Sequence, residues 1–201
     1  DNVVILNPTE ETKEHYFNIQ HIAERTMELK RREASYDAAT KPKPGIQSVT
    51  VQLAGNISGP RDVPSITDYG ASGIGLARSE EILYDFTALP PMDEMRGIFY
   101  GDYLEIGMAI RRESIPNRKG YPVLIRTIDV GGEKIPPCTR QFFKDKDPNR
   151  YRGVKVLLDQ RDLFRTQIES IQMAAAECDE IGFFIPMVCD LSLIHISEPT
   201  R

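Results

Sequence analysis

The chain has 201 residues, a length typical of one large domain or of one domain with part of a second. Its formal net charge of −5 gives no reason to expect general affinity for nucleic acid or for anionic membranes. No apolar run approaches the roughly 20 residues of a membrane-spanning helix, and the first residues lack the form of a signal peptide. Cys138, Cys178 and Cys189 lack metal-ligand spacing, which predicts neutral thiols and a reducing, cytoplasmic compartment.

The first segment predicts a short strand over Val3–Leu6, followed by a long helix. Thr9 is a favourable N-cap, and the two glutamates that follow it suit the positive end of a helix dipole. Apolar residues then recur at helical spacing, and His15 and His21 lie among charged residues, where we expect them to face solvent. The stretch ASYDAATKPKPG should end this helix, and we place a domain boundary near Ala38–Gly45.

After this boundary, strand and helix patterns alternate. Strands are predicted within SVTVQLAGNI, GIGLARSE, YPVLIRTIDVGG and IGFFIPMV. A turn and short helix over GPRDVPSITDYGA, and longer helices over Met92–Arg112 and Asp159–Cys178, should connect them. The alternation predicts an α/β fold with parallel strands, either a doubly wound sheet or a (β/α) barrel.

Each long helix has a predicted buried face. On the first of them it contains Phe99, Tyr103, Ile106 and Ile110. On the second, for which Asp159 is the expected N-cap, it contains Phe164, Ile168, Ile171 and Ala175.

Polar side chains occur in or just after the predicted strands. Asn56, Arg78 and Arg126 share this position, and the carboxyl ends of parallel strands are where α/β proteins place functional groups. Arginine binds phosphate or carboxylate well because its planar fork donates two parallel hydrogen bonds. Together with Arg152, which lies in a following loop, the arginines could converge on one small polyanion.

A structural interpretation of the arginines stays open at this stage. Each could form a separate salt bridge with one of three nearby carboxylates, Glu80, Asp129 and Asp159. Gly131–Gly132 could bring backbone amides close to a ligand, although a glycine pair after a strand is more often a turn. Neither a dinucleotide-binding nor a P-loop glycine motif is present, and no catalytic triad or metal-ligand cluster can be recognised.

Several motifs resemble a known family. GIGLARSEEILYDFTALPPMDE and RTIDVGGEK resemble motifs of phosphoenolpyruvate-protein phosphotransferase, enzyme I of the bacterial sugar phosphotransferase system. LNPTEE, AGNISGPRDV and RDLFRTQIESI are similar to further segments of that family, and all of them come in the family's order over about residues 3–190.

The resemblance implies a barrel that binds phosphoenolpyruvate (PEP) and Mg²⁺ at the carboxyl ends of its strands. In this family the arginines that match Arg78 and Arg126 hold the phosphoryl group, and the one that matches Arg152 lies nearby; we add Asn56 to these expected substrate ligands. The implied reaction moves the phosphoryl group from PEP to a histidine of the enzyme and then to the carrier protein HPr. The implied whole protein is a cytoplasmic homodimer without membrane insertion or nucleic-acid partner.

The same resemblance divides the chain. Residues 1–45 correspond to the end of the phosphohistidine domain and a linker helix, and residues 46–191 to the first part of a (β/α)8 TIM-type barrel. Residues 192–201 do not continue the family pattern and are predicted to be a foreign tail. The phosphoacceptor histidine, the Mg²⁺ ligands and the catalytic cysteine are expected outside this sequence, so the fragment alone is expected to be inactive.

Local departures from the family pattern concern three places. Ser79 replaces the usual threonine, and Pro64 should shorten a helix. The loop DPNRYRGVK is one residue shorter than in the family and lacks its glycine, which bears on the role of Arg152.

Two other functions remain open. The chain could be a fragment of pyruvate phosphate dikinase or PEP synthase, which share the barrel and the arginines. It could also be a non-catalytic interaction protein on a degraded barrel, although Arg78 and Arg126 are kept.

Overall fold

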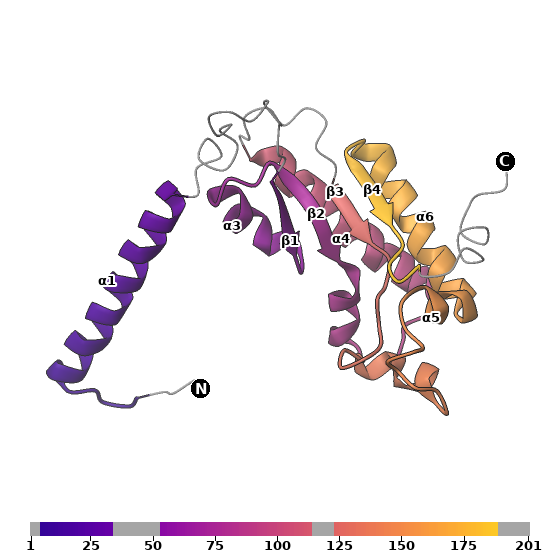
Figure 1. The fold of residues 1–201 in the computed structure, drawn as a ribbon, viewed down its shortest axis with the longest axis horizontal. Coiled ribbons are helices and arrows are strands. Elements are labelled where there is room, and N and C mark those ends of the chain that lie inside the picture. The colour runs from indigo at the N-terminus through magenta and orange to yellow at the C-terminus, as the bar shows by residue number, and fades with distance from the viewer. Residues whose placement is uncertain (1–4, 34–52, 114–122, 189–201) are drawn as a thin grey trace, which may run out of the picture. The chain divides into compact units, whose positions relative to one another are not determined.

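The computed structural model describes residues 5–33, 53–113 and 123–188 (Figure 1). The chain forms two compact units, one of Asp1–Gln52 with Asp68–Gly70 and one of Leu53–Thr67 with Ala71–Arg201. The boundary predicted near Ala38–Gly45 and the predicted foreign tail both lie outside the described residues. Within the described ranges, no helix combines the length and apolarity needed to cross a membrane.

The first unit contains helix α1, Glu10–Glu33. Thr9 caps it as predicted, since its Oγ1 accepts a hydrogen bond from the Thr12 amide at 3.2 Å. The strand predicted over Val3–Leu6 is wrong for Ile5 and Leu6, which are not in a strand, and its other two residues lie outside the described part. His15 and His21 are exposed, as predicted.

The second unit is built on a sheet of four parallel strands. These are β1 (Ala54–Ile57), β2 (Gly73–Arg78), β3 (Val123–Arg126) and β4 (Ile181–Phe184). Their order in the sheet is the order in the sequence, β1-β2-β3-β4, and every neighbouring pair is parallel. The predicted α/β class with crossover connections is therefore confirmed.

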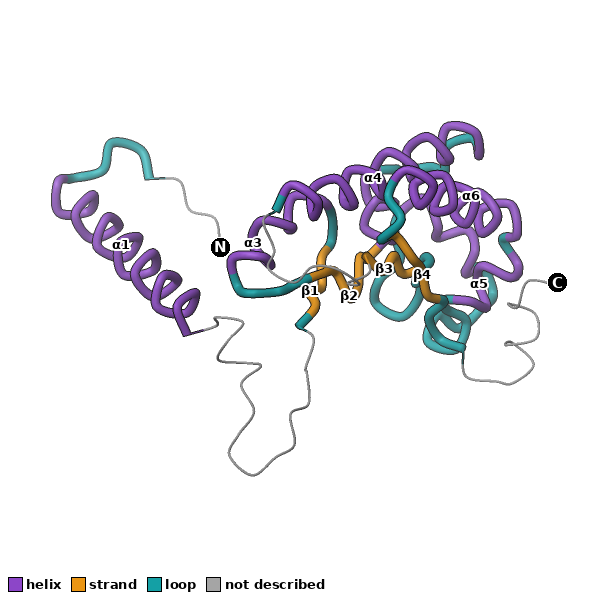
Figure 2. Tube along the Cα trace, turned by 90° about the horizontal axis from the view of Figure 1, so that it is seen from above, coloured by secondary structure: helices purple, strands orange, loops and turns teal. Residues whose placement is uncertain are grey.

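Helices cover one side of this sheet. The first crossover contains a 3-10 turn and α3 (Val63–Asp68), the second contains α4 (Met92–Arg112), and the third ends with α6 (Arg161–Glu177). Figure 2 shows α4 and α6 side by side on the same side of the strands. The residues of β3 alternate accordingly: Val123 and Ile125 are buried against the helices, whereas the other two residues of the strand are only partly buried.

The core between the sheet and the helices is apolar. Its fully buried members include Ile57, Ile74, Phe99, Tyr103, Ile106, Ile110, Ile125 and Ile171. The helix α4 has the predicted bounds and the predicted buried face, which confirms that part of the sequence analysis.

Close packing explains Gly107 in the middle of α4. A β-carbon at this position would lie 2.7 Å from Cys178 Sγ and 2.9 Å from Ile181 Cδ1, so only glycine lets the helix approach the start of β4. Cys178 and Cys138 are buried free thiols, and burial raises the pKa of both, so they stay neutral as predicted. Cys189 lies outside the described residues.

The helix predicted over Asp159–Cys178 is α6 (Arg161–Glu177), and a short helix that was not predicted, α5 (Val154–Asp159), ends directly before it. Asp159 is the last residue of α5, so its assignment as an N-cap is wrong. Its carboxylate instead accepts hydrogen bonds from Lys146 Nζ at 2.7 Å and from Tyr151 Oη at 2.8 Å. These contacts, led by that of Lys146, lower the pKa of Asp159.

The buried face of α6 also differs from the prediction. Ile171 is buried, but Phe164, Ile168 and Ala175 are only partly buried. The residues that are buried are Leu163, Thr166, Gln167, Ser170, Ile171 and Ala174. Three of them are polar, and for this reason the apolar pattern indicated a neighbouring face of the helix.

Candidate functional site

Two of the predicted site residues meet at the carboxyl ends of the strands. Arg78 is the last residue of β2 and Arg126 the last residue of β3, and the two are register partners in the parallel ladder. Register partners in neighbouring strands direct their side chains to the same face of a sheet. This face is the one opposite Ile125, whose side chain packs under the helices. The structure therefore brings the two arginines together, as the sequence analysis expected.

Arg126 is enclosed by carboxylates. Its Nη2 donates a hydrogen bond to Glu80 Oε1, and its Nη1 lies 3.1 Å from Asp129 Oδ2. The side chain of Arg126 is 16% exposed, that of Glu80 is 0% exposed and that of Asp129 is 5% exposed. A buried carboxylate is stable only when it is paired, so Glu80 and Asp129 depend on this guanidinium.

Asp129 also binds the third predicted arginine. Arg152 Nη2 donates to Asp129 Oδ2 at 2.9 Å and its Nε donates to Oδ1 at 3.3 Å, a two-point contact of the fork with the carboxylate. Asp129 Oδ2 is thus shared by Arg126 and Arg152. The four side chains form one network in the order Glu80, Arg126, Asp129, Arg152. Two of the three arginines therefore form salt bridges, but they share Asp129, whereas the structural interpretation gave each arginine a separate bridge.

The glycine pair after β3 allows this approach. Gly131 and Gly132 have φ angles of 132° and 63°, in the region that favours glycine. A β-carbon on Gly131 would lie 2.3 Å from the β-carbon of Arg152. The amide of Gly131 donates to the Lys134 carbonyl and that of Gly132 to the Pro148 carbonyl. These amides are therefore used within the chain, so the glycine pair makes a turn and a close contact, and its amides are not presented to a ligand.

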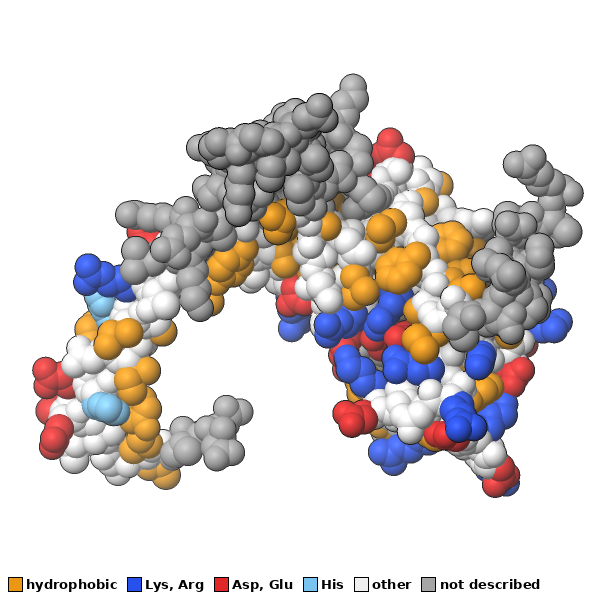
Figure 3. All heavy atoms as spheres, viewed as in Figure 1, with side chains coloured by type: hydrophobic (Ala, Val, Ile, Leu, Met, Phe, Trp, Pro, Cys, Tyr) orange, Lys and Arg blue, Asp and Glu red, His pale blue; other side chains and the backbone are white. Residues whose placement is uncertain are grey.

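Arg78 and Asn56 are less constrained. The side chain of Arg78 makes no hydrogen bond or ion pair with the residues that the structure describes. Asn56 is exposed in β1, and its register partner is Leu76, two residues before Arg78. Asn56 therefore lies on the same face of the sheet as Arg78, one strand away. Figure 3 shows basic side chains gathered with a few acidic ones beyond the carboxyl ends of the strands.

Sequence reasoning missed a buried polar network behind these arginines. Gln167 of α6 donates hydrogen bonds to Ser79 Oγ and Tyr103 Oη, and it accepts one from the Ile128 amide. Ser79 Oγ in turn donates to the carbonyl of Arg126 at 2.6 Å. The one signal available in the sequence was a glutamine among the apolar residues of a helix, which reads as a solvent-facing position.

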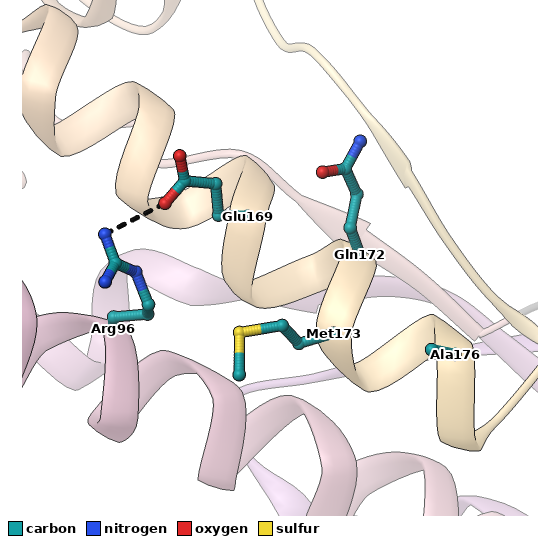
Figure 4. A pocket seen from close by; sticks show the side chains of 5 residues that line it. All are labelled: Arg96, Glu169, Gln172, Met173 and Ala176. Carbon is teal, nitrogen blue, oxygen red and sulfur yellow. Dashed lines mark ion pairs between the residues drawn. The ribbon is translucent and has the colours of Figure 1, made fainter.

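A separate surface groove lies between α4 and α6. It is lined by Arg96, Glu169, Gln172, Met173 and Ala176, and its ion pair joins Arg96 Nη2 to Glu169 Oε2 at 2.9 Å (Figure 4). None of these residues belongs to the predicted site. The carboxyl edge of the sheet is therefore the stronger candidate.

Comparisons with known proteins agree with this choice. The family described as PEP-utilising enzyme, PEP-binding domain, matches residues 32–198. The phosphoenolpyruvate-protein phosphotransferase of Streptomyces coelicolor is 32% identical over 188 residues, which are 93% of this chain and 30% of that protein. That of Geobacillus stearothermophilus is 32% identical over 203 residues, covering 95% of this chain and 30% of the relative.

A third relative is the multiphosphoryl transfer protein of Rhodobacter capsulatus. It is 29% identical over 186 residues, which are 92% of this chain and 20% of the relative. The chain thus spans 20% to 30% of the length of these relatives. The family match covers most of the chain, and we conclude that the chain belongs to the PEP-utilising enzymes through their PEP-binding domain.

Proposed function

We propose that this chain is part of a phosphoenolpyruvate-protein phosphotransferase, and that Arg78, Arg126 and Arg152 bind the phosphoryl group of PEP. One observation carries this proposal: Arg78 and Arg126 lie side by side at the carboxyl ends of β2 and β3, and Asp129 joins Arg126 to Arg152. Asn56 is a further ligand on the same face of the sheet. The names of the relatives support PEP as the substrate.

The charges of the site suit a phosphoryl group. Three guanidinium groups stand against the two carboxylates of Glu80 and Asp129, which leaves one positive charge, and Arg78 forms no ion pair with a described carboxylate. Arg126 Nε is buried and has no acceptor among the described residues, and a phosphoryl oxygen is an acceptor of the required type. Phosphoryl transfer depends mainly on positioning and on fixed charges, and carboxylate-held guanidiniums supply both.

The four strands are the first part of a (β/α)8 barrel in this proposal. Sequential strand order supports it, because a doubly wound sheet reverses its order and carries helices on both faces. The presence of α4 and α6 on one side supports it as well. A structure of the whole protein with helices on both faces of this sheet would contradict the barrel.

The whole protein would move the phosphoryl group to one of its own histidines and on to HPr, as a cytoplasmic homodimer. Mg²⁺ is part of this proposal only through ligands beyond the described residues. Within residues 5–33, 53–113 and 123–188, no three histidine, cysteine, aspartate or glutamate side chains cluster to hold a metal. Glu80 and Asp129 are bound to arginines, so they do not fit Mg²⁺.

The direct test is binding of PEP to the 201-residue chain by calorimetry at low salt. We expect weak, salt-sensitive binding that Arg126→Ala abolishes, because screening weakens exposed charges and Arg126 lies at the centre of the network. Arg161→Ala is the control, since Arg161 is an exposed arginine on α6. Equal binding by the Arg126→Ala and Arg161→Ala chains would contradict the role of Arg126.

The catalytic test uses the whole protein and follows labelled phosphate from PEP to the protein. Arg126→Ala should cost about 3–4 kcal/mol of transition-state stabilisation, as loss of one preorganised donor does in other enzymes. Undiminished labelling of this variant would refute the proposed function.

A further inference from the structure

Gln167 is a fully buried polar residue at the contact between α6 and the sheet, where an apolar side chain would be expected. Its side chain is 0% exposed, yet its amide meets three elements. Oε1 accepts a hydrogen bond from the Ile128 amide at 3.0 Å, and Nε2 donates to Ser79 Oγ at 2.9 Å and to Tyr103 Oη at 2.8 Å. Both amide hydrogens and the amide oxygen are therefore hydrogen-bonded, which offsets the cost of removing the amide from water.

One branch of this network leads to the arginine site. Ser79 follows Arg78 directly at the end of β2, and its hydroxyl accepts from Gln167 and donates to the Arg126 carbonyl at 2.6 Å. The Ser79–Arg126 bond ties the carboxyl end of β2 to the carboxyl end of β3, and the Gln167–Ser79 bond joins this link to α6. The Ile128 branch acts on the same region, because Ile128 precedes Asp129, the carboxylate that holds both Arg126 and Arg152.

The other branch ends inside the helical layer. Tyr103 belongs to α4 and is 1% exposed, so its hydroxyl bond to Gln167 joins two helices, and the same hydroxyl also lies close to the Ser79 side chain without contacting the Arg126 carbonyl. The orientation of the amide is determined by its neighbours, because exchange of its oxygen and nitrogen would place NH₂ against the Ile128 N–H.

We propose that Gln167 is a positioning residue for the Arg78–Arg126 pair. It acts through the Ser79 hydroxyl on the Arg126 carbonyl and through its own oxygen on the Ile128 amide. This inference rests on the proposed role of the arginines in binding PEP. It extends that role to α6, because a residue of that helix sets the spacing of the two guanidinium-bearing strand ends.

Two variants of matched chemistry separate positioning from simple stability. Ser79→Ala and Tyr103→Phe each delete one hydroxyl that accepts from the same Gln167 Nε2, but only the Ser79 hydroxyl continues to Arg126. Both should lower the urea midpoint of the chain by a similar amount. Only Ser79→Ala should weaken PEP binding, by roughly three- to tenfold, the range that loss of one net hydrogen bond implies.

A third variant tests whether Gln167 acts through Ser79. Gln167→Met keeps the length of the side chain and removes all three hydrogen bonds, and it should weaken PEP binding at least as much as Ser79→Ala. The double variant should bind as weakly as Gln167→Met alone, because the two residues act in series. Multiplied effects in the double variant, or equal losses of affinity in Ser79→Ala and Tyr103→Phe, would overturn the proposal.

A readout without ligand separates this inference from the proposed function. The Nε–H of Arg126 is buried, so its ¹⁵N resonance can be followed in the free protein. We expect it to shift in Ser79→Ala and Gln167→Met and to stay in place in Tyr103→Phe. If the unsubstituted chain fails to bind PEP while this pattern holds, the proposed function fails and the positioning role stands. An unchanged resonance in all three variants overturns the positioning role.

Discussion

The two ends of the sheet each carry an arginine–carboxylate cluster, and the clusters differ in burial and composition. At the carboxyl end, Arg126 and Arg152 share Asp129, whose side chain is 5% exposed. At the amino end, Arg111 of α4 contacts the turn before β4, with its Nη2 2.7 Å from both Asp179 Oδ1 and Glu180 Oε2. Asp179 is 91% exposed, so water solvates much of this second cluster.

The two clusters also differ in the parts of the molecule that they join. The amino-end cluster joins one helix to one turn, and hydrogen bonding to Glu180 raises the pKa of Arg111, which stays charged. The carboxyl-end cluster holds two guanidiniums together at the edge where Arg78 also ends its strand. Burying two carboxylates to do so is costly, and such a cost is typical of sites that must hold charges in fixed positions.

The largest effect should come from Asp129→Ala. This change leaves the guanidiniums of Arg126 and Arg152 without their shared partner in a largely buried place. Removing one partner of a buried ion pair typically lowers the free energy of unfolding by about 3–5 kcal/mol. Urea denaturation of the chain measures the loss.

Glu169→Ala is the matched control for that experiment. Glu169 also binds an arginine, but its side chain is 40% exposed, so we expect a loss of at most about 1 kcal/mol. Equal losses for the two variants would show that the carboxyl-end cluster is no more buried in solution than a surface pair.

An intermediate effect is expected at Asp102 of α4, which belongs to neither cluster. Burial, followed by the charge of Glu105, raises the pKa of Asp102 to about 6. The folded protein therefore binds this proton more tightly than the unfolded chain does. The contribution of Asp102 to stability is full below about pH 4 and is lost as the pH rises through about 6.

The test is urea denaturation of Asp102→Asn from pH 4 to pH 8. At pH 8 the variant should be more stable than the unsubstituted chain by about 1–2 kcal/mol, less than the whole shift implies because the carboxyl keeps some contact with water. At pH 4 the two should be equally stable. A constant difference across this range would show that Asp102 titrates normally.

The smallest effect should come from Arg111→Ala. Because its cluster is solvated, the shift in the urea midpoint should be at most about one third of that of Asp129→Ala. Binding of PEP should not change, since Arg111 lies at the other end of the sheet from Arg78 and Arg126. A loss of PEP binding in this variant would break the functional separation of the two ends.

Much of the fold was predictable because the signals are local. The apolar run of Val123, Leu124 and Ile125 predicts a strand, and β3 (Val123–Arg126) lies there. The apolar residues of α4 recur with a helical period and are buried as predicted. The face of α6 was predicted wrongly because Gln167 and its polar neighbours are buried by pairing, which apolar periodicity does not register.

The sequence by itself determined that Arg78 and Arg126 lie in or just after parallel strands, since strand periodicity and crossover spacing depend on nearby residues. It also contains the motifs from which the resemblance to a PEP-utilising family was recognised. Only the tertiary structure decided which carboxylate binds which arginine, and that Asp129 serves two of them. The Arg126–Glu80 and Arg152–Asp129 pairings join residues that are distant in the chain, and their geometry depends on packing that no local pattern encodes.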